Sequence, residues 1–306
     1  MNGQKLEALR DRIFAALERG AVREARRSIE KLRRYEPAEA ASLLTALCIE
    51  ERDAKGALKA WQECRARAPH DPYTIFLRAR IHLLMGERRA ALRVLTPLFG
   101  APMSAEVAEK VYNLAGQCAR FLGAAEKAVE FYARARDAAP NLTLRALNAS
   151  NVLFNRHYLP AAPAEEKRAA EEYGALFAQI RTFDHCAHRR GQRLRIGYLS
   201  PDVREHVVLS FSYALMTALD PARFTVTAYA LGTEDDYTEQ VKRSVQGFRN
   251  LSHVTPEEAA YAIYRDGIDI LVDLAGHTAG STLPILAYRP APVQISGIGY
   301  FASTGL

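Results

Sequence analysis

Paired cysteines are missing from this sequence of 306 residues, and their absence argues against two classes of protein. The four cysteines, Cys48, Cys64, Cys118 and Cys186, form no CxxC pair and show no metal-ligand spacing. Neither a disulfide framework nor a zinc site is therefore expected. The first three fall among apolar helical positions, where a reduced cysteine packs as a small core residue. A reducing compartment, the cytoplasm, is predicted, and no metal or other cofactor is expected.

Long apolar runs are missing as well. No stretch of about 18 uncharged apolar residues occurs, so a membrane partner is not expected. The N-terminal segment MNGQKLEALRDRIF is charged and amphipathic, and it lacks the apolar core of a signal peptide. No basic motif alternates with aromatic residues, so nucleic acid is not expected as a partner either. The formal charge of +6 is spread along the chain among glutamates, as on a solvated helical surface.

What the sequence does contain is an ordinary globular composition in two contrasting halves. Hydrophobic residues make up 49% and charged residues 25%, so a buried core is expected. The length suggests about two domains. We predict helical repeats over 1–157, a helix and a basic linker over 158–193, and an α/β domain over 194–306.

The first half repeats itself. Small residues recur at Ala25, Ala57, Ala91 and Ala128, in steps of 32, 34 and 37 residues. Glycines stand five positions before three of them, at Gly20, Gly86 and Gly123, and prolines stand twelve positions after three of them, at Pro37, Pro69 and Pro140. Small residues let two antiparallel helices approach closely, and each proline is expected to end a helix. The period resembles that of the tetratricopeptide repeat, although a helical bundle without repeats is an alternative.

Such repeats bury their apolar faces on their neighbours and form a superhelix with a concave groove. We expect this groove to bind an acceptor protein or peptide, whose identity the sequence does not give.

The second half changes period. Apolar runs at 194–200, 224–232, 268–276 and 291–300 predict buried parallel strands, with a short one at 248–254. Helices are predicted between them at 207–219, 255–267 and 281–290. The helix at 255–267 should begin at Thr255 as N-cap and end at Gly267. Alternating strands and helices indicate a Rossmann-like sheet.

Ligands of parallel sheets bind at the carboxyl ends of the strands. Three loops follow predicted strands there: SPDVREH, GHTAGS and GYFASTGL. Their glycines permit close approach of the backbone to a ligand.

These residues carry a family resemblance. The blocks LRIGYLSPDVREH, DGIDILVDLAGHTAG and YRPAPVQISGIGYFASTGL, in this order, resemble the protein O-GlcNAc transferases, including the plant SPINDLY proteins and bacterial relatives. The resemblance implies tetratricopeptide repeats followed by an inverting glycosyltransferase of the two-lobed GT-B fold. It further implies a nucleotide-sugar donor, UDP-GlcNAc or GDP-fucose, and Ser or Thr hydroxyls of proteins as acceptors.

The resemblance also implies a catalytic residue. His206 matches the family's active-site histidine in the loop after the first catalytic strand. An imidazole there can accept or relay the hydroxyl proton of the acceptor. Whether His206 is the base or positions the acceptor stays open at this point, and Asp202 is expected to cap or orient the same loop. His185 and His188, in the basic linker, are expected to be solvated.

Donor or acceptor contacts are implied for His277, Thr278, Ile298, Gly299, Tyr300 and Thr304. The GHT turn that contains His277 and Thr278 either hydrogen-bonds the sugar or diphosphate, or simply caps its strand. The stretch from Ile298 to Tyr300 matches a family segment near the donor sugar, with packing as the alternative for Tyr300.

Two departures leave the function open. The last motif reads GYFASTGL where the family has a form like GYPGTTGL, and Tyr261 and Tyr264 occupy a helix that carries acidic and histidine groups in animal relatives. The resemblance also stops at Leu306, inside the first lobe, so a second lobe on a further chain segment or partner chain is expected. The chain is therefore either part of a protein O-glycosyltransferase or a repeat scaffold whose lobe is catalytically degenerate.

Overall fold

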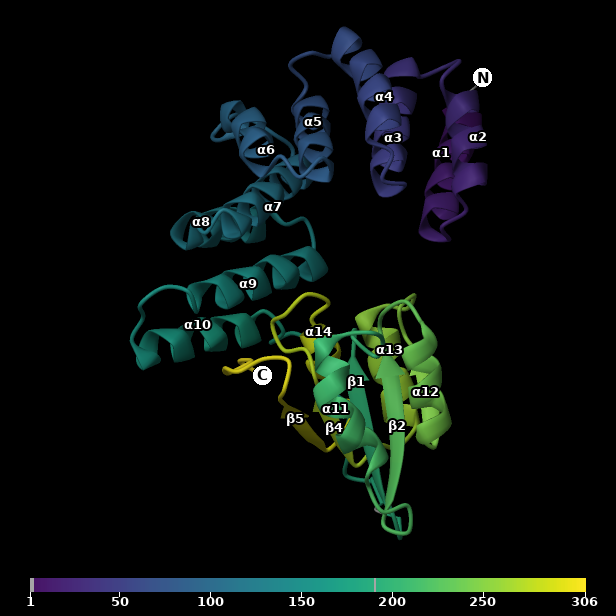
Figure 1. Cartoon of the computed structure of the whole chain (residues 1–306), viewed down its shortest axis with the longest axis vertical. Helices are drawn as coiled ribbons and strands as arrows, with labels where there is room; N and C mark the ends of the chain where they lie inside the picture. The colour runs from purple at the N-terminus through teal and green to yellow at the C-terminus, as the bar shows by residue number, and fades with distance from the viewer. Residues whose placement is uncertain (1–2, 190) are drawn as a thin grey trace. The chain divides into compact units, whose positions relative to one another are not determined.

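The computed structural model describes residues 3–189 and 191–306, which form two compact units, Met1–Pro140 and Asn141–Leu306 (Figure 1). This boundary differs from the one predicted after residue 157. Helix α9 (Leu142–Arg156) continues the repeat pattern, yet it belongs to the second unit. Its inner residues Ala146, Ala149 and Leu153 share a hydrophobic core with Leu199 of the sheet.

The first unit is built from helical hairpins. Its helices are α1 (Gly3–Glu18), α2 (Val22–Leu32), α3 (Pro37–Glu50), α4 (Ala54–Arg67), α5 (Pro72–Leu84), α6 (Arg88–Leu95), the 3-10 turn η1 (Thr96–Leu98), α7 (Ala105–Phe121) and α8 (Ala125–Ala138). Each helix packs on the next along the chain. Ala25, Ala57, Ala91 and Ala128 are each 0% exposed, as expected for positions where helices approach closely. The predicted repeat array is confirmed.

The turns of the hairpins need a left-handed residue. Gly20, Gly86 and Gly123 have φ of 66°, 78° and 76°. In the hairpin without a glycine, Arg52 occupies the equivalent position and has φ of 60°. For a residue with a Cβ this conformation costs free energy, because the Cβ lies too close to the following carbonyl oxygen.

The role predicted for the prolines was wrong at Pro37. Helix α2 already ends at Leu32, and Pro37 is the first residue of α3. Pro72 begins α5 in the same way. Proline is favoured there because the first turn of a helix leaves its N–H groups without partners in any case.

The second unit contains a five-stranded parallel sheet with the order β3-β2-β1-β4-β5. Its strands are β1 (Leu194–Ser200), β2 (Phe224–Ala230), β3 (Gly247–Asn250), β4 (Ile270–Asp273) and β5 (Val293–Ser296). Its helices are α9, α10 (Pro163–Ala175), α11 (Val207–Thr217), α12 (Asp236–Ser244), α13 (Pro256–Arg265) and α14 (Leu283–Leu286).

Side chains that alternate along the strands build a core on each face of the sheet. Ile196 and Tyr198 of β1 pack in a cluster with residues of α11 and α12. Leu199 packs in another cluster with residues of α9, α10, α13 and α14. The predicted α/β architecture is confirmed, although β4 and β5 are shorter than the runs that predicted them and α12 was not predicted.

The segment expected to be a solvated linker is instead attached to the sheet. Phe183 stacks on Tyr264 with ring centroids 4.5 Å apart. His188 Nε2 lies 2.6 Å from Oδ1 of Asp269, and the backbone N–H of Arg195 donates to the other oxygen at 2.7 Å. Burial raises the pKa of Asp269, but these hydrogen bonds and the charges of Arg195 and His188 outweigh it, so the net pKa is lowered. The prediction that His188 is solvated was therefore wrong.

Candidate functional site

A pocket of about 720 Å³ lies at the carboxyl ends of the strands. It is lined by residues that follow β1, β2, β4 and β5, among them Asp202, Gly232, Thr278 and Gly299. Strands β1 and β4 are neighbours in the sheet. The chain continues from β1 to β2 on one side of this pair and from β4 to β5 on the other, so the two loops run toward opposite edges of the sheet. Such a switch point leaves a crevice where parallel sheets bind their ligands.

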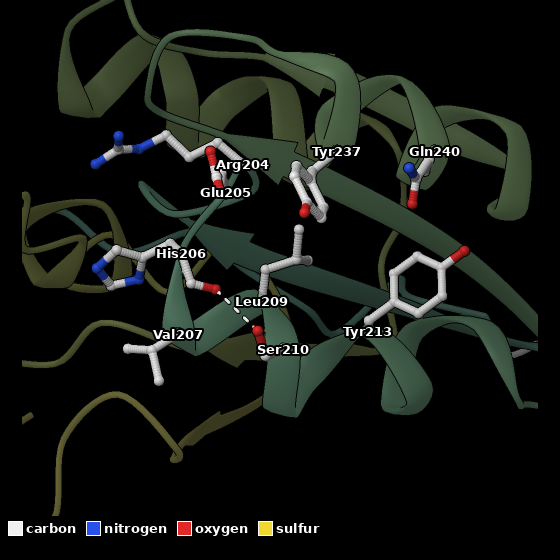
Figure 2. Close-up of a pocket in the computed structure, with 9 residues that line it drawn as sticks. All are labelled: Arg204, Glu205, His206, Val207, Leu209, Ser210, Tyr213, Tyr237 and Gln240. Atoms are coloured by element: carbon white, nitrogen blue, oxygen red, sulfur yellow. Dashed lines mark hydrogen bonds between the residues drawn. The ribbon is translucent and has the colours of Figure 1, made fainter.

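His206 begins helix α11 and lines this pocket. As the N-cap residue it has an extended backbone, and its Nδ1 accepts a hydrogen bond from the backbone N–H of Val208 at 3.3 Å. Its side chain is 36% exposed. His206 also lines a second pocket of about 470 Å³ between α11 and α12 (Figure 2). The imidazole points away from the side formed by Tyr213 and Gln240 (Figure 2).

Two neighbours of His206 favour opposite tautomers of its ring. The bond from Val208 N–H requires a lone pair on Nδ1, so the neutral ring then carries its proton on Nε2. The carboxylate of Asp202 lies 3.5 Å from the same Nδ1 and favours a proton there, which would leave Nε2 as a base. Asp202 is only 9% exposed, so its charge is poorly screened.

Arg204 adds a cation to the same edge. It lines both pockets, and its guanidinium lies 3.7 Å from Asp202 at a partly exposed position. Because 41% of its side chain is exposed, the guanidinium can also donate to an anionic group. Sequence reasoning did not single out Arg204, although it stands two residues before His206 in the same loop.

The turn after β4 is held by a buried carboxylate. Asp273 is 0% exposed and accepts hydrogen bonds from the backbone N–H groups of Ala275 and Gly276, each at 2.9 Å. It also accepts from the hydroxyls of Thr282 and Ser296, the latter at 2.6 Å. This residue was not predicted, and it fixes the ends of β4 and β5 next to the pocket.

Thr278 and Gly299 reach the pocket from these fixed ends. The Thr278 hydroxyl donates to the carbonyl oxygen of Ala275 at 2.7 Å, so it caps the turn while remaining partly exposed. A Cβ at Gly299 would overlap the carbonyl oxygen of Leu274. Glycine is therefore required there by packing as well as by any approach of a ligand.

His277 lies behind the pocket. It is 2% exposed, and its Nδ1 and Nε2 bond to the hydroxyl of Ser150 at 2.8 Å and the carbonyl oxygen of Thr304 at 3.0 Å. Tyr173 packs edge-on against the ring. Burial lowers the pKa of His277 to about 4, against the opposing effect of the bond to Thr304. Both ring nitrogens are therefore engaged, and this geometry favours the turn-holding alternative over a donor contact.

Tyr300 belongs to the same buried layer. It is 5% exposed, and its hydroxyl lies 2.5 Å from Nε2 of His157. Burial raises the pKa of Tyr300 to about 12. Its position favours the packing alternative. Ile298, by contrast, is 46% exposed and does not line the pocket.

The structure therefore brings together His206, Thr278 and Gly299 among the predicted residues. Phe154 and Phe301 also line this pocket. Phe301 is 77% exposed and stands at the departure from the family's GYPGTTGL motif. Tyr264, at the other departure, donates its hydroxyl to the carbonyl of Asp184, away from the pocket.

Comparisons with known proteins cover the segment that carries this candidate site. Residues 171–306 match the model of Glycosyl transferase family 41. The probable SPINDLY transferase of Petunia hybrida is 33% identical over 136 residues, and a peptide N-acetylglucosaminyltransferase of Caenorhabditis elegans is 34% identical over 125 residues. These alignments cover 43% and 40% of this chain but only 14% and 11% of the relatives. The family resemblance read from the sequence is confirmed.

A solved structure shares the fold of the chain. A mutant O-GlcNAc transferase from Thermobaculum terrenum matches with a TM-score of 0.60 and 23% identity, covering 98% of this chain and 52% of that one. At this identity the likeness shows the fold alone, helical repeats followed by an α/β lobe with a parallel sheet. The chain spans about half the length of that transferase.

Two kinds of feature are absent from the described part of the chain. No helix within residues 3–189 and 191–306 is long and apolar enough to cross a membrane. Over the same residues, no group of three or more His, Cys, Asp or Glu side chains is placed to hold a metal ion.

Proposed function

We propose that this chain supplies the first lobe and the acceptor-selecting repeats of a protein O-glycosyltransferase, which transfers GlcNAc from UDP-GlcNAc to Ser or Thr hydroxyls. One observation carries the proposal. His206 lines a pocket at the carboxyl edge of the sheet, within the segment that matches family 41. The relatives' names describe transfer of N-acetylglucosamine from UDP-N-acetylglucosamine to peptides, which favours this donor over GDP-fucose.

The chemistry requires one bond to form and one to break. The acceptor hydroxyl oxygen attacks the anomeric carbon of the sugar, and the bond from that carbon to the diphosphate oxygen breaks. The electron pair leaves with the diphosphate, and the hydroxyl proton must be removed. Negative charge grows on the leaving group, so cationic and N–H donors near it lower the barrier. Arg204 is the cation of this lobe nearest to His206 in sequence, and a second lobe would supply further donors.

His206 has two possible tasks in this reaction. With its proton on Nδ1, facing Asp202, its Nε2 takes the hydroxyl proton as a general base. With its proton on Nε2, it instead donates a hydrogen bond that positions the acceptor or the diphosphate. We favour the first task, because attack of a hydroxyl requires loss of a proton and His206 is the one imidazole that lines the described pocket.

The repeats would select the acceptor. Their helices build stacked hairpins of the kind that bind extended peptides, and we assign the acceptor protein to this array. We place the reaction in the cytoplasm, in keeping with the free thiols of Cys48, Cys64 and Cys118.

The test is transfer by the product of the whole reading frame that contains this chain. Labelled UDP-GlcNAc and GDP-fucose are each offered with a library of Ser- and Thr-containing peptides. The proposal expects UDP-GlcNAc to support transfer. His206→Ala should lower kcat roughly 10²–10⁴-fold with little change in the donor KM. His253→Ala, at an exposed histidine outside both pockets, serves as the control and should keep the wild-type rate.

Asp202→Asn separates the two tasks of His206. Asparagine keeps the shape of the buried side chain but removes the charge that favours a proton on Nδ1. Under the base mechanism kcat falls and the donor KM stays constant. A rise of the donor KM alone would contradict the base mechanism. A folded product that transfers neither sugar, with wild type and His206→Ala alike, would favour the non-catalytic scaffold instead.

A further inference from the structure

A cationic pocket lies in the first unit, apart from the candidate active site. Its volume is about 660 Å³, and it is formed where the third hairpin, α5 and α6, meets the end of α7. Residues of the α5–α6 turn, the first turns of α6, and Phe121 and Leu122 line it. It therefore lies at the turn edge of the hairpins. Nothing in the sugar-transfer proposal uses it.

The charges around this pocket are strongly unbalanced. Arg88, Arg89 and Arg93 line it, with Glu87 as the single carboxylate. Glu87 is already engaged, because Oε2 lies 2.6 Å from Nδ1 of His82. Among the described residues, none of the three arginines has an ion pair. Unpaired guanidinium groups that face one pocket attract carboxylates, which they bind in a bidentate manner.

An aromatic ring stands among these cations. Phe121 is 52% exposed, and the guanidinium groups of Arg88 and Arg120 lie 4.8 Å and 4.7 Å from its ring centre. The Nε of Arg88 is buried and has no hydrogen-bond partner. A buried donor without a partner is costly, so an incoming acceptor would gain more here than at an ordinary surface arginine. Leu122, 38% exposed, adds apolar surface beside the ring.

The preceding junction of the array is built to the same plan and keeps two of the cations as Lys55 and Lys59, but it lacks the third cation and the aromatic ring. There Ala54 takes the place of Arg88, and Leu83 and Leu84 take the places of Arg120 and Phe121. Asp53, the counterpart of Glu87, accepts a hydrogen bond from Gly56 N–H at 2.9 Å and caps its helix. Glu87 makes no such cap. The arginines and the ring are therefore particular to one junction and are not required by the repeat.

We propose that this pocket binds an acidic peptide segment of a partner protein, with an apolar side chain of the segment against Phe121 and its carboxylates against Arg88, Arg89 and Arg93. The charge excess selects the acidic residues, and the exposed ring and Leu122 select an apolar one between them. A partner protein would then bind the chain at this pocket through its acidic segment, while its Ser or Thr hydroxyl reacts at the candidate active site.

The repeat supplies a matched pair of variants for the test. Arg89→Glu with Arg93→Glu reverses two exposed charges in the pocket. Lys55→Glu with Lys59→Glu reverses two exposed charges at the equivalent positions of the preceding repeat, 34 residues earlier, so both double variants change the net charge equally. All four side chains are exposed, and both proteins should keep their fold.

The full 306-residue chain is titrated into a labelled peptide of glutamates around a central leucine, and anisotropy is recorded. We expect the Arg89 and Arg93 double variant to lose roughly tenfold or more in affinity, and the lysine double variant less than about twofold. Phe121→Ala, or replacement of the peptide's leucine by serine, should weaken binding several-fold.

Equal losses in the two double variants would overturn the proposal, because binding would then follow net charge alone. Failure of the wild type to bind the peptide would overturn it as well. In the last titration, a single-stranded RNA of the same charge replaces the peptide. If it bound as tightly as the peptide and depended on the same arginines, the pocket would be a general polyanion site and the acidic-peptide assignment would be wrong.

Discussion

The two units of this chain hold their structures in different ways. The first unit repeats one helical hairpin, in which a small buried residue, a left-handed turn and a pair of helices recur along the chain. The second depends on single buried polar groups, above all Asp202, Asp269, Asp273 and His277, each below 10% exposure. Among the described residues of the first unit, Glu109 is the one buried side chain that is an acid, a histidine, a lysine or an arginine. Asp202, Asp273 and His277 follow or end strands β1 and β4 at the carboxyl edge of the sheet, whereas Asp269 precedes β4 at the opposite edge. Periodic helices need few such groups.

The largest expected effect comes from Asp273→Ala. This change leaves four buried or partly buried donors without their acceptor, and it should destabilise the second unit by about 4 kcal/mol. The first unit should not respond. Urea unfolding separates the two, because the single tryptophan, Trp61, reports on the first unit, and amide exchange in β1 reports on the second. An equal shift of the Trp61 transition would contradict the contrast between the units.

A pH dependence should follow from His277. Its folded pKa of about 4 lies below the ordinary value of 6.5, so the unfolded chain binds the proton first as pH falls. The stability of the second unit is therefore complete above pH 6.5 and decreases by about 3 kcal/mol on acidification to pH 4. Unfolding midpoints measured across this range should flatten in His277→Gln. The exposed His253→Gln should leave the slope as it is; a slope equally reduced there would rule out the assignment.

Two glycines allow a direct comparison of the units. Gly86 has φ of 78° and open space around it, whereas a Cβ at Gly305, with φ of 81°, would overlap the carbonyl oxygen of Ala170 in α10. Gly86→Ala should cost about 1–2 kcal/mol for the left-handed backbone alone. Gly305→Ala should cost clearly more, since α10 must also move. Thermal unfolding of both variants tests the order, and equal costs would contradict it.

The smallest effect is a gain. Arg52→Gly should stabilise the first unit by about 1 kcal/mol, because it relieves a left-handed arginine at the position that other hairpins give to glycine. Trp61 fluorescence in urea measures the shift. Arg27→Gly, in the middle of α2, is the control and should destabilise by a similar amount. A loss of stability in both variants would show that the Arg52 turn is not strained.

The sequence predicts most of the fold because its signals are local. The apolar run at 194–200 is strand β1, and the helix expected after Thr255 begins there, with Thr255 and Glu258 forming a reciprocal cap. Helix α12 was not predicted from the sequence because it is short and polar. Its one signal was Asp235 followed by Thr238, which form a cap of the same kind.

The site is only partly predictable because its decisive contacts are distant in sequence. Ser150 and His277 are 127 residues apart, and His157 and Tyr300 are 143 apart. No local pattern indicates that His277 turns inward to such a partner while Thr278, next to it, faces the pocket. The family resemblance located the loops correctly, but which side chain of each loop reaches the pocket depends on packing.

The turn after β5 stores conformational strain beside the candidate site. Ile298 has φ of 67°, a region that β-branched residues almost never occupy, and it is held there next to the tightly seated Gly299. Such a conformation costs on the order of 1–3 kcal/mol. A ligand or partner that let residue 298 return to an extended backbone would gain this energy, whereas one that kept the turn as it is would not. The strained residue therefore precedes Gly299, which lines the pocket, and a ligand that changed the backbone at residue 298 would recover this energy.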